Sequence, residues 1–151
     1  MKFYEKYTDS SYIESDGKHS IVQAIDKGSS CKWQGINTAK KRVVKYRVDG
    51  GIISSQAEPK CDYAIYVEGD RVYLVELKGS NYAHALEQID ATLDKLIRNP
   101  QIETSSVNGR IVLTKGKLPN LRYSKETSLN KKLKKLNGTL ASRTRLFEED
   151  I

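Results

Sequence analysis

Apolar and polar side chains alternate in the middle of the chain in a pattern that predicts three β-strands. Residues 43–48, 63–67 and 71–78 are rich in Val, Ile and Tyr, which favour extended backbone. The clusters 49–51 and 68–70, which contain Gly, follow the first and second segments and predict turns. We therefore expect antiparallel strands, with the second and third forming a hairpin.

Other segments repeat their apolar residues at the spacing of an α-helix. Residues 81–98 place Tyr, Ala, Leu and Ile on one face, with Ser80 as the expected N-cap. Shorter helices are predicted over residues 20–27 and 127–136, because each has an apolar stripe and ends near a Gly.

These elements predict one α/β domain over residues 1–151. The apolar segment 110–114 follows the long helix, so we expect it to lie parallel to strand 71–78 through a helical crossover. The expected fold is a small mixed sheet flanked by helices in αβββαβ order. Its core spans residues 43–114, and residues 115–147 are expected to form a basic helical extension.

The third predicted strand ends in charged side chains that share one face. Side chains alternate along a strand, so Val72, Glu76 and Lys78 lie on the same side. A carboxylate and an ammonium group at the end of an apolar strand are costly unless they are paired or bound to a cation. The predicted hairpin also brings Asp62 to the same end, so the three charged side chains can converge.

Two carboxylates and a lysine at one point are the groups that metal-assisted phosphodiester hydrolysis requires. Asp62 and Glu76 would hold a hard divalent cation, Mg²⁺ or its substitute Mn²⁺, which polarises phosphate and activates water. Lys78 would position or deprotonate the water, or stabilise charge in the transition state. The sequence does not separate these roles. An ion pair of Lys78 with either acid is the structural alternative.

Asp62, followed by Glu76-Leu77-Lys78 on a strand and then by a helix, resembles the motif of the PD-(D/E)xK nuclease superfamily. The likeness is greatest to small stand-alone members such as Holliday junction resolvase-like and restriction endonuclease-like nucleases. The resemblance implies a restriction-endonuclease-like core and Mg²⁺-dependent cleavage of DNA that recognises a structure or an end. It also implies catalytic roles for Asp62, Glu76 and Lys78, with metal held by Asp62, Glu76 and the Leu77 carbonyl.

The chain departs from the family's pattern in two places. Pro59 precedes Asp62 by three positions instead of adjoining it. Many members also carry an acid on an N-terminal helix, for which Glu14, Asp16 and Asp26 are the candidates here. Without that acid, metal binding would depend on the motif residues alone.

Three further polar residues are candidate auxiliary groups at the same site. Asp49 follows the first predicted strand and could reach the metal, although most Asp-Gly pairs only form turns. Glu58 lies four residues before Asp62 and supplies a further ligand or none. Gln88 is expected two turns into the long helix, where some nuclease families carry a glutamine.

The distribution of charge indicates a partner with phosphate groups. The net charge is +7, and residues 110–145 hold eleven Lys and Arg against one acid, Glu126. Such a concentration is typical of binding to a nucleic-acid backbone, although a solvated helix face would have the same composition. DNA is favoured over RNA only by the resemblance. The expected contacts are Lys115, Lys117, Lys131, Lys132, Lys134 and Lys135.

The rest of the chain suggests a cytoplasmic protein without a membrane partner. Cys31 and Cys61 lack the spacing of a zinc site or a redox pair, so we expect free thiols. No segment has the apolar length of a membrane span. Residues 28–42 read as a polar connection in which Trp33 is either a core residue or a base-stacking group. Residues 148–151, which include three acids, read as a frayed tail.

Two other functions stay open on this sequence. One is a non-catalytic nucleic-acid-binding module with the same fold, in which the acids are structural. The other is a protein-interaction domain, such as an accessory factor of a phage or defence system, with a basic face that meets an acidic protein. A homodimer is expected if the substrate is cut in both strands with two-fold symmetry.

Overall fold

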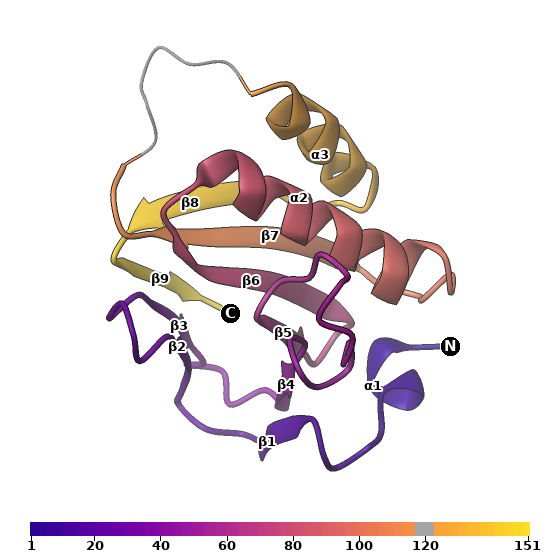
Figure 1. Cartoon of the computed structure of the whole chain (residues 1–151). Helices are drawn as coiled ribbons and strands as arrows, with labels where there is room; N and C mark the ends of the chain where they lie inside the picture. Colours follow the sequence, from indigo (N-terminus) through magenta and orange to yellow (C-terminus); the bar gives the residue numbers. More distant parts are fainter. Residues whose placement is uncertain (117–122) are drawn as a thin grey trace.

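The computed structural model of the chain has a mixed α/β architecture (Figure 1). It describes residues 1–116 and 123–151, without the side chain of Lys78. The α/β class with a mixed sheet, predicted from the sequence, is confirmed. Within this described part the larger sheet has six strands, which are in spatial order β1 (Ile13–Gly17), β4 (Val43–Arg47), β5 (Tyr63–Val67), β6 (Arg71–Gly79), β7 (Ser106–Leu113) and β8 (Leu140–Thr144).

The predicted hairpin and crossover are both present in this sheet. β4, β5 and β6 pair antiparallel, and Tyr63 of β5 lies opposite Val75 of β6. β7 pairs parallel to β6, with Ile111 opposite Glu76, and β8 pairs parallel to β7. The carboxyl ends of β6, β7 and β8 therefore meet at one edge of the sheet, where β5 begins.

Helices cover one face of this sheet, as Figure 1 shows for α2 and α3. α2 (Tyr82–Leu93) continues into a π-helical turn, η1 (Asp94–Arg98), and α3 (Ser124–Lys135) packs beside it. The prediction of Ser80 as the N-cap is wrong by one residue. The N-cap of α2 is Asn81, whose side chain accepts the His84 N–H at 3.1 Å. A short helix, α1 (Phe3–Lys6), opens the chain. No helix among the described residues is long and apolar enough to cross a membrane.

A second, smaller sheet covers the opposite face, and it overturns one predicted helix. β2 (Ile21–Ile25) pairs antiparallel with β3 (Lys32–Ile36), which pairs parallel with β9 (Leu146–Asp150). The predicted helix 20–27 is therefore a strand and a turn. Its apolar residues mimicked helical spacing because two isoleucines, Ile21 and Ile25, point outward while Val22 and Ala24 are buried.

Two apolar cores lie on either side of β6. Val72 and Leu74 pack toward the helices, whereas Val75 and Leu77 pack toward the smaller sheet. The predicted alternation of faces along this strand is confirmed. Trp33 is fully buried in the second core, so of its two interpretations the core residue is the correct one.

The C-terminal third of the chain supplies more β-strands to the two sheets than the sequence predicted. The strand predicted over 110–114 begins earlier, at Ser106. Residues 115–147, expected as a helical extension, also supply β8 to the larger sheet. The expected frayed tail, 148–151, lies largely in β9. The αβββαβ order therefore describes only part of the fold.

Candidate acid pocket at the edge of the sheet

Asp62 is fixed by its own backbone at the point where β5 begins. Its N–H donates to the Val75 carbonyl at 3.1 Å, and its carbonyl accepts the Val48 N–H at 2.9 Å. The preceding residue, Cys61, is tied to α2 because its N–H donates to Thr92 Oγ1 at 2.8 Å. Three elements therefore hold this carboxylate in place: β4 and its turn, β6, and α2.

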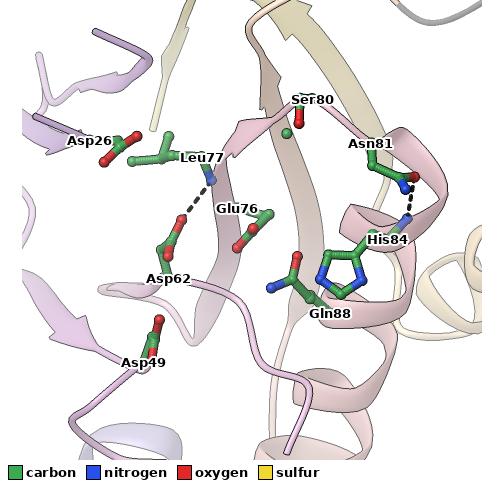
Figure 2. Close-up of a pocket in the computed structure, with 10 residues that line it drawn as sticks. Asp26, Asp49, Asp62, Glu76, Leu77, Ser80, Asn81, His84 and Gln88 are labelled. Atoms are coloured by element: carbon green, nitrogen blue, oxygen red, sulfur yellow. Dashed lines mark hydrogen bonds between the residues drawn. The ribbon is translucent and has the colours of Figure 1, made fainter. Parts of the chain in front are cut away.

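Glu76 lies beside Asp62 at the end of β6. The Leu77 N–H donates to Asp62 Oδ2 at 2.9 Å, which orients the aspartate across the strand end (Figure 2). Only 7% of Glu76 is exposed, and its Oε1 is buried without a hydrogen-bond partner among the described atoms. The structure thus brings together two of the three predicted motif residues. The third, Lys78, is on β6, and its side chain is outside the described part.

Burial and mutual repulsion favour protonation of this pair. Burial raises the pKa of Glu76 to about 10, and the negative charge of Asp62 adds to that rise. Burial also raises the pKa of Asp62, although the Leu77 N–H that it accepts stabilises its charged form. Two adjacent carboxyl groups of this kind lack a compensating positive charge among the described side chains.

The two acids open into a pocket of about 380 Å³. Figure 2 shows Asp26 and Asp49 reaching it from the strand side, while Asn81, His84 and Gln88 reach it from α2. The predicted auxiliary residues Asp49 and Gln88 therefore line the pocket.

Asp49 is held near the pocket by a buried lysine. Lys60 Nζ lies 3.8 Å from Asp49 Oδ1 and donates to the carbonyls of Ser55 at 2.7 Å and Glu58 at 3.0 Å. Glu58, the third auxiliary candidate, does not line the acid pocket, because its carboxylate pairs with Lys95 of η1. It borders a neighbouring hollow instead.

The donor set fits a hydrated Mg²⁺ better than a fully protein-bound metal. The described side chains contain no group of three or more His, Cys, Asp or Glu placed to hold a metal ion. Mg²⁺ usually keeps several waters and is bound through one or two carboxylates plus substrate phosphates. Asp62, Glu76 and the Leu77 carbonyl would suffice for that, and the unpartnered Oε1 of Glu76 is the atom that a cation would satisfy.

No family model, curated protein or solved structure matches this chain. A functional proposal therefore depends on the chemistry of the pocket itself. That chemistry consists of a buried pair of adjacent carboxyl groups, two further aspartates at the rim and polar side chains from the start of a helix.

The lysines of α3 that were predicted to bind nucleic acid lie away from the pocket. α3 ends beside Val107, whose N–H donates to the Leu136 carbonyl, whereas Glu76 lies opposite Ile111, four residues further along β7. At about 3.3 Å per residue the end of α3 is roughly 13 Å from the acid pocket along the strand. Lys131 and Lys134 line a separate hollow there, and Lys135 also lies in the last turn of α3.

Two of the predicted contacts have other surroundings. Lys132 Nζ lies 2.8 Å from Asp90 and 3.3 Å from Asp94, so its charge is largely neutralised by α2 and η1. Lys115 is exposed just beyond β7, at the same edge as the pocket. Lys117 lies outside the described residues.

Sequence reasoning missed part of the pocket lining. Asp26 was a candidate for the N-terminal acid, but on a helix that proves to be a strand, and it reaches the pocket from the turn after β2. Ser80 and Asn81 line the pocket as well, although Ser80 was considered only as the helix cap and Asn81 only as the first residue of the helix. The β-branched residues before Asp26 were the signal that could have placed it at a strand end.

The buried acid pair predicts that the metal-free protein loses stability as pH rises. The pKa of Glu76 is raised from its ordinary value of 4.5 to about 10 in the folded state. The stability that the protonated Glu76 contributes is therefore fully present below pH 4.5 and is lost as the pH rises towards 10. The free energy of unfolding should fall by at most about 1.4 kcal/mol per pH unit. Melting temperatures in EDTA should therefore fall across this range, and Glu76→Gln should flatten the profile. An equal slope in both proteins would contradict this assignment.

Proposed function

We propose that the acid pocket binds a divalent cation, Mg²⁺ or Mn²⁺, and hydrolyses phosphodiester bonds in DNA. The observation that carries this proposal is the buried pair of Asp62 and Glu76, with Glu76 Oε1 unpartnered. Adjacent buried carboxylates destabilise a fold unless a counter-charge accompanies them. A pocket open to solvent at that point gives access to such a counter-charge and to a substrate.

Each residue of the pocket has a role that follows from its position. Asp62 and Glu76 would hold the cation, which when bound activates water and neutralises charge on the phosphate. Asp49 and Asp26 at the rim would accept hydrogen bonds from cation-bound water. His84 and Asn81, at the start of α2, would contact phosphate oxygens, since the first turn of a helix favours negative charge. Lys78 keeps the role that the motif assigns to it, in positioning the water or stabilising the transition state.

The order of the elements supports the resemblance to PD-(D/E)xK nucleases. The antiparallel strands β4, β5 and β6 are followed by α2 and by the parallel strand β7, and the acids lie where β5 begins and β6 ends. We propose on this basis that β4 to β7 form a restriction-endonuclease-like core. The second sheet, β2-β3-β9, would then be an addition that brings Asp26 to the pocket.

A non-catalytic nucleic-acid-binding module is the second candidate. It is favoured by one observation, that the described side chains include no group of three metal-ligating residues. In that case Glu76 would stay protonated, and basic residues such as Lys115 would bind the backbone without cleavage.

Cleavage assays separate the two candidates. We expect the wild-type protein to cut labelled single-stranded, duplex or branched DNA with Mg²⁺ or Mn²⁺ and not with EDTA, with RNA included as a competitor substrate. Lys78→Ala should reduce the rate roughly 10²-fold or more, because it removes a charge that acts in the transition state.

The matched control is Lys18→Ala, which removes an exposed lysine from the loop after β1, at the opposite edge of the sheet. It should cut at the wild-type rate. Binding of DNA without cutting, by all three proteins in every metal, would exclude the nuclease and favour the module.

A further inference from the structure

A second groove, of about 740 Å³, runs along the edge strand of the smaller sheet. β2 pairs only with β3 in the described structure, so its other edge is free to form the wall of this groove. The opposite wall comes from the larger sheet, from Lys45 of β4 and Tyr63 of β5. The remaining lining residues are Glu14, Ile21, Gln23, Ile25 and Lys27.

This groove and the acid pocket are lined by residues that are neighbours in the chain. Asp26 lines the pocket, and its two neighbours in the chain, Ile25 and Lys27, line the groove. Likewise Asp62 lines the pocket and Tyr63 lines the groove. Both hollows are therefore lined from the same two segments of the chain, the end of β2 with its turn and the start of β5.

The two isoleucines of the groove do not serve the cores of the protein. Ile21 is 50% exposed and Ile25 is 43% exposed, and they are among the few large apolar side chains that the described surface presents to solvent. Lys27 is exposed and forms no ion pair within the described residues. Apolar side chains exposed beside an unpaired cation indicate a binding surface for a ligand that is both apolar and anionic.

We propose that this groove binds a single-stranded segment of nucleic acid that leads into the acid pocket. The inference rests on the proposed function and narrows its substrate to DNA with a single-stranded end, flap or gap. A single strand exposes apolar base faces together with phosphates, which is the combination that the groove offers to bind. A duplex keeps its bases stacked inside and would leave Ile21 and Ile25 without a partner.

The residues of the groove would contact different parts of the nucleic-acid strand. Tyr63 is half-buried against the second core, and the rest of its ring faces the groove, where a base can stack on it. Lys45 Nζ lies over that ring, 5.5 Å from its centre, so the base would stack on the part of the ring that Lys45 leaves open, with its phosphate close to the ammonium group. Lys27, beside the pocket, would bind the phosphate next to the one that is cut.

Lys45 is fixed in place before any ligand binds. It donates to the Gln23 carbonyl at 2.9 Å and lies 3.3 Å from Glu14 Oε1. These contacts hold it across the groove between the two sheets. Its positive charge is shared with Glu14, so we expect Lys27 to contribute more to the salt dependence of binding than Lys45 does.

Oligonucleotide binding in EDTA tests the groove without requiring cleavage. Fluorescence anisotropy should show tighter binding of single-stranded than of duplex DNA by the full chain. Tyr63→Leu should weaken single-strand binding roughly five- to fifty-fold, and Tyr63→Phe should restore it, because the ring and not the hydroxyl stacks. Lys27→Ala should lower the slope of log affinity against log salt by about 0.7, with Lys18→Ala unchanged.

Photocrosslinking adds a readout that does not depend on affinity. A single strand that carries iodouracil should crosslink to Tyr63, as located by mass spectrometry, and should lose this crosslink in Tyr63→Leu. Crosslinks confined to α3, or equal binding by all variants that retain the fold, would overturn the proposal. A dimer that groove variants dissociate while oligonucleotide binding is unchanged would also overturn it, since the groove would then join two copies of the chain.

The groove and the nuclease proposal fail in different ways. Preferential binding of single-stranded DNA that depends on Tyr63, without cleavage in any metal, would support the groove proposal and exclude the nuclease proposal. Metal-dependent cleavage that is lost in Glu76→Gln but unchanged in Tyr63→Leu would retain the nuclease and exclude the groove.

Discussion

Replacement of Glu76 by Gln is expected to abolish cleavage while making the metal-free protein more stable. The amide removes a carboxyl group whose charged form is disfavoured by burial and by Asp62, and it can still donate a hydrogen bond to Asp62. In EDTA at mildly alkaline pH the gain should be roughly 1 to 3 kcal/mol. The rate of metal-dependent cleavage should fall roughly 10²–10³-fold or more, because a cation ligand is lost.

The opposite direction of these two effects is what distinguishes a functional acid from a structural one. Glu87→Gln is the matched control, since Glu87 is exposed on α2 and does not line the acid pocket. It should leave both stability and rate unchanged. Thermal unfolding in EDTA and cleavage with Mg²⁺ measure the two effects. If Glu76→Gln destabilised the protein by several kcal/mol, the carboxylate would be part of the structural framework, and the proposed site would be wrong.

Replacement of Glu149 by Ala is expected to cause the largest loss of stability. Glu149 accepts two hydrogen bonds from the guanidinium of Arg110, at 2.8 and 3.1 Å, and one from Trp33 Nε1 at 2.8 Å. Arg110 is only 7% exposed and its charge lies between the rings of Tyr73 and Phe147. Loss of the carboxylate leaves that charge buried without its partner, which costs about 3–5 kcal/mol.

The neighbouring acid provides the control for this prediction. Glu148 is exposed and accepts a hydrogen bond from Gln34 on the outer face of the smaller sheet. Glu148→Ala should change the free energy of unfolding by no more than about 0.5 kcal/mol. Urea unfolding of the two variants measures the difference. Equal losses would mean that β9 is held by its backbone pairing alone.

This network also explains why the acidic end of the chain was misjudged from the sequence. Four residues with three acids have the composition of a solvated tail, and nothing near them in the chain pairs with Glu149. Its partners, Arg110 and Trp33, are 39 and 116 residues away. Composition records local preference, whereas a buried ion pair is formed by tertiary contacts. The same applies to Lys132, whose partners lie on α2 and η1.

The centre of the fold was predictable because its signals are local. β5 and β6 have strongly apolar, β-branched sequences with a turn between them, and α2 has a long apolar stripe. The hairpin then determines that Asp62 and Glu76 meet. The smaller sheet was not predictable in this way, because outward isoleucines hid the alternation of β2. If the groove binds single-stranded DNA, the exposed Ile21 and Ile25, which made β2 hard to predict, are also residues that contact the ligand.

Cation binding to the metal-free protein tests the central claim most directly. Calorimetric titration of Mn²⁺ into the wild type and into Asp62→Asn, with and without a single-stranded oligonucleotide, measures it near neutral pH. We predict binding with release of protons in the wild type, because Glu76 must ionise, and loss of that binding in Asp62→Asn. Absence of binding in the wild type under both conditions, or equal binding by the two proteins, would contradict a metal site at Asp62 and Glu76.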